Sequence, residues 1–332
     1  MDVLEEKVYN DIVEQKLITD GDKVVLGVSG GPDSLSMLNI LNNIRKEKKI
    51  QFEIYVAHIN HMIRNEANDE EEFVKNFSKR LDIPFFSKRV DIKNIAKEVK
   101  QGTEEAGRKA RYDFFEEILS YTKSNKNAIA HNRNDKIETI IMNLLRGTGI
   151  SGLEGIKPIV NNKYIRPILK IDRQEIEEYC QKMQLDPRID KTNFENIYTR
   201  NKIRNIIIPY IKKEFNPNII DTIDRLSYLV SEEEKYLNKI VLEKYEKVLV
   251  QEKNNEIVFN LRKLNEEDDI IYKKIVLHAI NNINGNHLGI EKKHLDDIVK
   301  LGKKNVGNKF LTPKKNLKIY VNNGKMYISI VK

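Results

Sequence analysis

The segment Val24–Ser34, which reads VVLGVSGGPDS, decides the fold class of this chain. An apolar stretch suited to a buried strand runs into a turn with two adjacent glycines, and a helical pattern begins directly behind it. Glycines lack a Cβ, so the backbone N–H groups of such a turn can approach a phosphate closely. A helix N-terminus adds the positive end of its dipole. The segment therefore predicts a nucleotide phosphate site at the end of a strand.

The residue types in this turn predict how the phosphate is held. Pro32 stands where the first turn of a helix tolerates proline, and Asp33 is expected to bind a magnesium ion. The Walker pattern is excluded because no lysine follows the glycines, and the three spaced glycines of a dinucleotide fingerprint are missing too. The expected phosphate ligands are Ser29, Gly30, Gly31, Pro32 and Ser34.

Strand and helix patterns alternate over the first part of the chain. Apolar strands are predicted at residues 23–29, 52–59, 85–90 and 127–130, with amphipathic helical patterns between and after them. This alternation predicts an α/β domain, 1–212, with a doubly wound and mostly parallel sheet. Residues 213–332 are predicted to form a smaller α+β domain. It would contain a helix from Ile219 and a hairpin of strands 317–321 and 325–330.

Composition indicates a globular protein without a membrane segment. The chain has 332 residues, of which 40% are hydrophobic and 33% charged, and no run approaches the ~20 apolar residues of a membrane helix. Cys180 is the sole cysteine, so an internal disulfide and a cysteine metal cage are excluded. It is expected in a helical stretch away from the glycine turn. We expect a cytoplasmic protein.

The positive charge gathers near the C-terminus. Residues 291–332 hold eleven lysines and three acidic residues, which alone accounts for the net charge of +8. Such a segment suits a polyanionic partner such as RNA. The chain is also rich in lysine, asparagine and isoleucine throughout, so the same excess is compatible with genome composition.

Two further segments carry charged residues in helical patterns. Asp135 and Glu138 are three apart, so both carboxylates project from one side of a helix. They would share a magnesium ion or hold an ammonium group, or else complement the helix dipole. Arg108 and Arg111 lie one turn apart on another predicted helix, where both guanidinium groups suit a triphosphate.

The remaining candidates follow predicted strands or helices. His58, His61 and Arg64 follow the second strand, without the third ligand that a metal site would need, so binding of a nucleotide or an RNA edge is the preferred interpretation. Arg146 opens a glycine-rich stretch that is either functional or a helix stop. Arg200 and Arg204 lie on a predicted helix and suit contact with a phosphate backbone.

Taken together, these motifs resemble the tRNA(Ile)-lysidine synthetase family. The turn SGGPDS is similar to the PP-loop of ATP pyrophosphatases, and the other motifs occur in the family's order over about the first 210 residues. The matching segments are 29–34, 58–64, 104–112, 131–139, 146–153, 166–169 and 190–204. Beyond about residue 215 the resemblance depends on domain layout alone.

The resemblance implies a reaction and its participants. ATP would adenylate the wobble cytidine of the isoleucine tRNA with a CAU anticodon, and the amine of L-lysine would then displace AMP to form lysidine. It implies ATP and Mg²⁺ as cofactors, tRNA binding by residues 213–332, and no membrane partner; whether a homodimer forms stays open.

The same resemblance implies roles for single residues. The catalytic set would be Asp33, Arg111, Asp135 and Glu138, with Asp33 and Asp135 as metal ligands. ATP would also contact His58, Arg108 and Arg111, and the lysine and tRNA substrates would contact His61, Arg64, Asp135, Glu138, Arg146, Arg200 and Arg204. Asn134 departs from the pattern, since many relatives carry a second aspartate there.

Three other functions compete with this interpretation. A PP-loop enzyme that inserts sulfur into a tRNA base usually needs two cysteines or an iron–sulfur cluster, and this chain has one cysteine. A PP-loop ligase that forms an amide with ammonia lacks a recognisable ammonia-supplying domain here. A non-catalytic RNA-binding protein would have no need of Asp33, Asp135, Glu138 and the two arginines.

Overall fold

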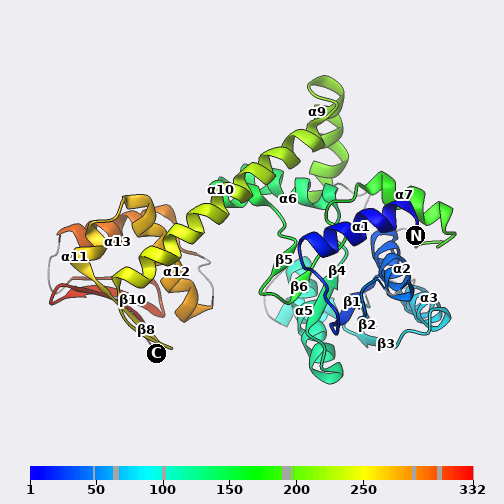
Figure 1. The fold of residues 1–332 in the computed structure, drawn as a ribbon, viewed down its shortest axis with the longest axis horizontal. Coiled ribbons are helices and arrows are strands. Elements are labelled where there is room, and N and C mark those ends of the chain that lie inside the picture. Colours follow the sequence, from blue (N-terminus) through cyan, green and yellow to red (C-terminus); the bar gives the residue numbers. More distant parts are fainter. Residues whose placement is uncertain are drawn as a thin grey trace. The chain divides into compact units, whose positions relative to one another are not determined.

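The structure is a computed structural model that describes residues 1–47, 49–62, 67–98, 102–188, 196, 198–285, 289–304 and 309–331. It divides into two compact units, Met1–Val230 and Ser231–Lys332 (Figure 1). The expected boundary after residue 212 and the division after Val230 differ because helix α10 (Ile219–Val248) runs through the point of division. Within the described residues, no helix combines the length and the apolar character needed to cross a bilayer.

The first unit is built on a six-stranded sheet of order β3-β2-β1-β4-β6-β5. All neighbouring strands are parallel except the short pair β5 and β6. The strands are β1 (Lys23–Gly27), β2 (Glu53–Asn60), β3 (Phe85–Arg89), β4 (Lys126–Ile129), β5 (Ile159–Val160) and β6 (Tyr164–Ile165). The predicted mostly parallel α/β fold is confirmed.

Helices cover both faces of this sheet, as the side-chain alternation of its central strand requires. Val24 and Leu26 of β1 pack into the core formed with α1, α2 and α7, whereas Val25 packs into a second core with α5 on the other face. The ribbon of these strands and helices is shown in Figure 1. Gly27 ends the strand where Phe115 lies so close that a Cβ would stand 2.6 Å from its ring.

The first unit contains helices of very different lengths. They are α1 (Val3–Glu14), α2 (Pro32–Lys46), α3 (Ala67–Arg80), α4 (Ile92–Glu98), α5 (Thr103–Thr122), α6 (Arg133–Leu145), the 3₁₀ turn η1 (Ile150–Glu154), α7 (Arg173–Lys182), α8 (Thr199–Lys202), the π-helical turn η3 (Ile203–Ile207) and α9 (Ile208–Glu214). Helix α10 begins in this unit. The predicted helical patterns fall in α2, α3, α5, α6 and α10.

The strand order places a switch point beside the glycine turn. Strands β2 and β3 lie on one side of β1, and β4 and β6 lie on the other. Ligands of such sheets collect beyond the carboxyl ends of the strands at this point. The turn 28–31 leaves β1 there, and Asn132, with helix α6 behind it, follows β4 there.

The second unit has a five-stranded antiparallel sheet of order β7-β8-β11-β10-β9. Its core includes Phe259, Tyr272 and Ile298, from strand β8 and helices α12 and α13. The hairpin β10–β11 matches the predicted one, whereas β7 and β9 were not anticipated. The elements are β7 (Leu249–Lys253), β8 (Glu256–Asn260), α11 (Leu261–Asn265), α12 (Asp269–Asn284), α13 (Lys292–Lys304), β9 (Phe310–Lys314), β10 (Leu317–Asn322) and β11 (Lys325–Ile330).

Candidate active site

The glycine turn folds around the hydroxyl of Ser34. The Oγ of Ser34 accepts hydrogen bonds from the backbone N–H of Ser29 at 3.1 Å and of Gly30 at 3.2 Å, and donates one to the carbonyl of Gly31 at 3.0 Å. Gly30 has φ +92°, a conformation that residues with a Cβ rarely adopt. Helix α2 begins at Pro32, as the sequence predicts. The Ser34 hydroxyl thus occupies two N–H groups of the turn, and the N-terminus of helix α2 directly behind the turn is the place where an anion is favoured.

A cavity of about 520 Å³ opens beside this turn. It is lined by the ends of β1, β2 and β4, by Arg111 and Phe115 of α5, and by Tyr198. Ser29, Gly31, Asp33, Ser34, His58 and His61 also line it, so the cavity brings together most of the residues predicted to bind ATP. Arg108 points elsewhere, since its guanidinium lies over the ring of Tyr112, 5.3 Å from the centroid.

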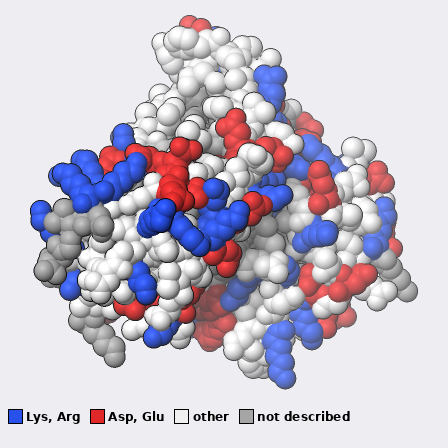
Figure 2. Space-filling model, turned by 60° about the vertical axis from the view of Figure 1, so that its left-hand side comes forward, with Lys and Arg blue, Asp and Glu red and all other residues white. Residues whose placement is uncertain are grey.

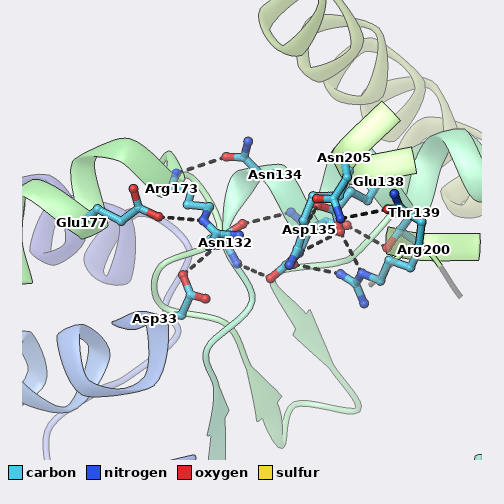
Figure 3. Close-up of polar contacts among 12 residues, drawn as sticks. Asp33, Asn132, Asn134, Asp135, Glu138, Thr139, Arg173, Glu177, Arg200 and Asn205 are labelled. Atoms are coloured by element: carbon cyan, nitrogen blue, oxygen red, sulfur yellow. Dashed lines mark hydrogen bonds and ion pairs between the residues drawn. The ribbon is translucent and has the colours of Figure 1, made fainter. Parts of the chain in front are cut away.

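The carboxylate of Asp33 is linked to helix α6 through one side chain. The Nδ2 of Asn132 donates a hydrogen bond of 2.7 Å to Oδ1 of Asp33. Asn132 also caps α6, because its Oδ1 accepts from the backbone N–H of Asp135 and its own N–H donates to Oδ2 of Asp135 (Figure 3). Burial and the nearby charge of Asp135 raise the pKa of Asp33 to about 6.

Asp135 and Glu138 lie on one side of α6, as predicted, but two arginines hold them. Arg200 donates to Oε2 of Glu138 at 2.8 Å and to Oδ1 of Asp135 at 2.9 Å (Figure 3). Arg204 donates to Oε1 of Glu138 at 2.6 Å and to the same oxygen of Asp135 at 2.9 Å. Burial alone would lower the pKa of each guanidinium. Both pKa values are nevertheless raised, because the effect of the two carboxylates is larger than that of burial.

This four-residue network differs from the sequence interpretation. Arg200 and Arg204 were assigned to an RNA backbone and the acids to magnesium or lysine, and no pairing between them was anticipated. Arg200 belongs to α8 and Arg204 to the π-helical turn η3, a kind of turn that often marks functional sites. Glu138 is 1% exposed, so its charge depends on these two partners.

The two histidines predicted to bind substrates both reach the cavity. His58 lies in β2 and is buried, with its Nδ1 2.8 Å from the carbonyl of Val28. Burial, reinforced by the charge of Arg111, lowers the pKa of His61 to about 4. Arg64 and the predicted segment 190–195 lie outside the described residues. Arg146 is exposed just after α6, and Gly147 follows it with φ +78°, the conformation of a helix stop.

Cys180 corrects one expectation from the sequence. It lies in a helix, α7, but not away from the glycine turn: its Sγ is 3.1 Å from Oγ of Ser36 and 3.7 Å from the carbonyl of Pro32. The contact between α2 and α7, which no local pattern encodes, brings it there. Burial raises the pKa of its thiol, so it is a packing residue rather than a nucleophile.

Sequence reasoning missed several residues around the cavity. His131 and Tyr198 line it, and the backbone N–H of Arg188 donates to the carbonyl of Gly30 at 3.0 Å. Asn134 accepts a hydrogen bond from the backbone N–H of Arg173 at the start of α7, so it fills a structural position here. Position relative to β4 was the available signal for His131, since it is the second residue after that strand.

Known proteins share both the sequence and the fold of this chain. Residues 2–211 match the PP-loop domain family. The chain is 43% identical over 305 residues to tRNA(Ile)-lysidine synthase of Clostridium perfringens, covering 92% of the chain and 64% of that protein. It is 42% identical to the protein of the same name from Clostridium acetobutylicum, covering 97% of the chain and 69% of that protein.

A solved structure shows the same fold at low identity. The U34-tRNA thiolase NcsA from Methanococcus maripaludis, with its [4Fe-4S] cluster, matches with a TM-score of 0.57 and 20% identity, covering 69% of this chain and 78% of that one. At this identity the match shows the fold alone. By its PP-loop domain and its relatives, this chain belongs to the tRNA(Ile)-lysidine synthase family of PP-loop proteins.

Proposed function

We propose that this chain binds ATP at the glycine turn and uses it to ligate L-lysine to the wobble cytidine of a CAU-anticodon isoleucine tRNA. The observation that carries this proposal is the meeting of three features at one cavity: the N-terminus of helix α2 behind the glycine turn, the acidic residue Asp33, and Arg111. The names of the relatives support the choice of substrates.

ATP binding follows from the chemistry of the cavity walls. The turn and the start of α2 would hold phosphate oxygens, and Arg111 would meet a phosphate from α5. Its guanidinium lines the cavity and forms no ion pair with any described carboxylate, so it is available to an anionic ligand. Burial lowers the pKa of Arg111, which a bound phosphate would counteract.

The residues present fit a magnesium ion. Asp33 and Asp135 are close enough for the charge of one to raise the pKa of the other, and a divalent cation would relieve that repulsion. Mg²⁺ commonly takes one or two carboxylates together with substrate phosphates. Asp33 would be the main ligand, because Asp135 already accepts hydrogen bonds from Arg200, Arg204 and Asn132. When bound, the ion would neutralise charge on the phosphates.

The reaction needs positioning and charge stabilisation more than a nucleophilic side chain. The base carbonyl oxygen attacks the α-phosphorus and pyrophosphate leaves. The neutral lysine amine then attacks the base carbon that bears this oxygen, loses a proton to solvent, and AMP leaves with the oxygen. Both nucleophiles belong to substrates, so the protein aligns them and stabilises the charge that develops on phosphate oxygens. Arg111 and the N-terminus of helix α2 are placed for that task.

The acidic pair is the proposed site for the lysine substrate. Asp135 and Glu138 are already matched by the two guanidinium groups of Arg200 and Arg204. A lysine ammonium would therefore bind by replacing one guanidinium rather than by filling an unpaired site. An arginine released in this way would be free to contact an anionic group, including the tRNA backbone.

The second unit and the side chains of His61, Arg64 and Arg146 are proposed to contact tRNA. Lys303 of the lysine-rich segment 291–332 is paired with Asp269, so part of the lysine excess is neutralised internally. Basic and acidic side chains also lie intermixed on the face in Figure 2. Binding would then depend on distributed phosphate contacts and weaken with salt. A cytoplasmic location and a homodimer remain predictions.

Incorporation of labelled L-lysine tests this proposal directly. The protein is incubated with ATP and Mg²⁺ and either isoleucine CAU tRNA or methionine CAU tRNA as the matched control. We expect label in the isoleucine tRNA alone, together with AMP and pyrophosphate. Pyrophosphate release without incorporation of label would support the adenylation step and reject lysine as the nucleophile. Absence of both signals would reject the proposed reaction and favour a non-catalytic RNA-binding protein.

A further inference from the structure

Two histidines that line the cavity form hydrogen bonds with different kinds of partner, one with an acceptor and the other with a donor. The Nδ1 of His58 faces the carbonyl oxygen of Val28 at 2.8 Å, and the Nδ1 of His131 receives the Nε of Arg166 at 3.2 Å. Both rings line the cavity. Within the described residues, no hydrogen bond reaches the Nε2 of either ring. The second nitrogen of each ring is thus the one left for a ligand.

The partner atoms fix the tautomers. A guanidinium only donates hydrogen bonds and stays protonated, so Nδ1 of His131 must carry a lone pair and its proton must sit on Nε2. A carbonyl oxygen only accepts, so Nδ1 of His58 carries the proton and its Nε2 is the acceptor. Of these two imidazoles, that of His131 therefore donates through Nε2 and that of His58 accepts.

Arg166 is an unusual residue to find in this position. It is 7% exposed and forms no ion pair with a carboxylate in the part of the chain that the structure describes. A buried cation without a counter-charge is costly, and burial lowers the pKa of Arg166. Its other partners are neutral: the carbonyl of Lys157 at 2.7 Å and the hydroxyl of Tyr112.

The sheet itself brings Arg166 to His131. Strands β4 and β6 are parallel, with Ala128 opposite Ile165, so the residues that follow each strand emerge side by side. Arg166 comes directly after β6, and the backbone of His131 is tied to the end of β4 by a hydrogen bond to Ile129. Arg166 is the first residue of segment 166–169 (RPIL), which is one of the segments that resemble the family in sequence. The proposed reaction gives this segment no role.

The other charges around His131 mostly favour the neutral ring. Among the groups with the largest influence, Asp135 favours the charged ring, whereas Arg166, Arg200 and Arg108 oppose protonation. Burial is the largest influence, and together these groups lower the pKa of His131 to about 4. Among the described residues, only Arg166 forms a side-chain hydrogen bond with the ring, so it selects between the two neutral tautomers.

We propose that Arg166 is a positioning residue that holds His131 as a neutral imidazole with its proton on Nε2, directed at a substrate oxygen in the cavity. A neutral donor can stabilise charge that develops on an oxygen without forming a permanent ion pair with the ground state. The oxygen belongs either to the ATP phosphates or to the base carbonyl. The identification of that oxygen rests on the proposed function, whereas the tautomer does not.

Nitrogen-15 NMR of the histidine-labelled full chain tests the tautomer without any substrate. We expect His131 to show a protonated Nε2 and His58 a protonated Nδ1 at neutral pH, with assignments from the His131→Gln and His58→Gln variants. Arg166→Met should shift His131 toward a mixture of tautomers. Arg108→Met is the matched control, because it removes a positive charge that acts on His131 but no hydrogen bond, so the tautomer should stay unchanged.

Three results would overturn the assignment: a protonated Nδ1 on His131 in the unmodified chain, a charged ring at neutral pH, or an unchanged tautomer in a folded Arg166→Met variant. If Arg166→Met fails to fold, the spectra of the unmodified chain and of the Arg166→Lys variant still test the tautomer of His131. Lysine retains a donor but cannot reproduce the planar fork, so partial retention of the tautomer is expected.

A second pair of variants tests what the donor does. In His131→Gln the amide nitrogen reaches the place of Nε2, whereas in His131→Asn it reaches only the place of Nδ1. Loss of a preorganised donor to a developing oxyanion typically costs about 10²–10³-fold in rate. We expect His131→Asn to slow adenylation about 10²–10³-fold relative to the unmodified chain. His131→Gln should adenylate at least tenfold faster than His131→Asn.

Measurements of ATP binding distinguish whether the oxygen that His131 contacts belongs to a phosphate or to the base carbonyl. Weaker ATP binding without tRNA in His131→Asn assigns the donor to a phosphate, and unchanged ATP binding with slower adenylation assigns it to the base carbonyl. Equal activity of His131→Asn and the unmodified chain would reject a role for the donor. If the unmodified chain itself shows no adenylation, the proposed function fails while the NMR result on Arg166 stands on its own.

Discussion

Asn132 donates a hydrogen bond of 2.7 Å to the carboxylate of Asp33 and at the same time caps the helix that carries Asp135. One amide therefore connects the phosphate turn after β1 to the acidic helix after β4. The connection crosses the switch point of the sheet, where the two segments would otherwise be independent. Among the described residues, the Asn132 amide is also the side chain that donates a hydrogen bond to the ionised form of Asp33, which opposes the effect of burial on its pKa.

Asn132→Ala is expected to destabilise the protein and to raise the pKa of Asp33 above about 6. Loss of an N-cap side chain typically costs about 0.5–2 kcal/mol in the free energy of unfolding. Urea unfolding and titration of Asp33 by NMR measure the two effects. Asn132→Asp is the matched control, because it keeps a capping oxygen but places a second negative charge beside Asp33. It should raise the pKa without losing the cap, and a lowered pKa in either variant would contradict the geometry.

Asp33→Asn is expected to stabilise the free protein at neutral pH. The pKa of Asp33 is about 6 in the folded chain and 3.8 for an ordinary aspartate, so its stabilising contribution is complete below about pH 4 and is lost as the pH rises through 6. At pH 7.5 the variant should be more stable than the unmodified chain by about 1–3 kcal/mol, and the difference should vanish near pH 4. Urea unfolding at both pH values measures it. A variant that is less stable at pH 7.5 would refute the raised pKa.

Magnesium binding is expected to strengthen as the pH rises and Asp33 loses its proton. Only the ionised carboxylate of Asp33 would bind the cation, so ATP binding in the presence of Mg²⁺ should strengthen between about pH 5 and 7. Calorimetric titrations of ATP with and without Mg²⁺ measure this dependence. In Asp33→Asn the magnesium-dependent part should disappear. Equal magnesium dependence in both proteins would assign the ion to other ligands.

Gly30→Ala and Gly31→Ala are expected to differ although the glycines are neighbours. Gly30 has φ +92° and its Cβ would lie 3.3 Å from Val74, so alanine is strained there. A residue forced into such a conformation typically loses about 1–3 kcal/mol. Gly31 has φ −77°, and its Cβ would meet nothing closer than 3.6 Å, so the fold should tolerate alanine. Thermal unfolding of both variants compares them, and equal destabilisation would contradict the described turn.

Glu138 and Arg204 are expected to couple in a double-mutant cycle. Glu138→Gln leaves two guanidinium groups without one of their two acids, and Arg204→Met removes two of the donors to a carboxylate that is 1% exposed. Each single change should cost about 2–4 kcal/mol, because a buried charge loses its partner. The double variant should cost less than the sum by about 1–3 kcal/mol. Additive costs in urea unfolding would show that the pair does not interact.

The sequence predicted the parallel sheet and its phosphate turn because their signals are local. The apolar strands alternate with amphipathic helices, and the pair Gly30-Gly31 marks the turn wherever the rest of the chain lies. The helix with Asp135 and Glu138 was predicted for the same reason. Strands β7 (LVQEK) and β9 (FLTPK) were missed because the large apolar residues of each are two neighbours at its start, followed by residues without an apolar–polar alternation.

The arrangement of the candidate site depends on contacts between distant segments, which no local pattern contains. Arg200 and Arg204 lie more than sixty residues after the acids that they hold, and their sequence spacing fits an RNA-binding helix equally well. Arg166 and His131 meet only because β6 pairs with β4. The position of Cys180 was misjudged for the same reason, since the packing of α7 on α2 decides it.

The burial of Cys180 against α2 has a practical consequence. The chain has a single thiol, and it lies within 3.7 Å of Pro32, the first residue of the helix behind the phosphate turn. A thiol reagent can modify it only when α7 and α2 separate, so its labelling rate measures local opening of the protein at this place. Any ligand that tightens the turn slows that reaction. Under the proposed ATP binding, this single thiol would report nucleotide occupancy without an engineered cysteine and without a background label to subtract.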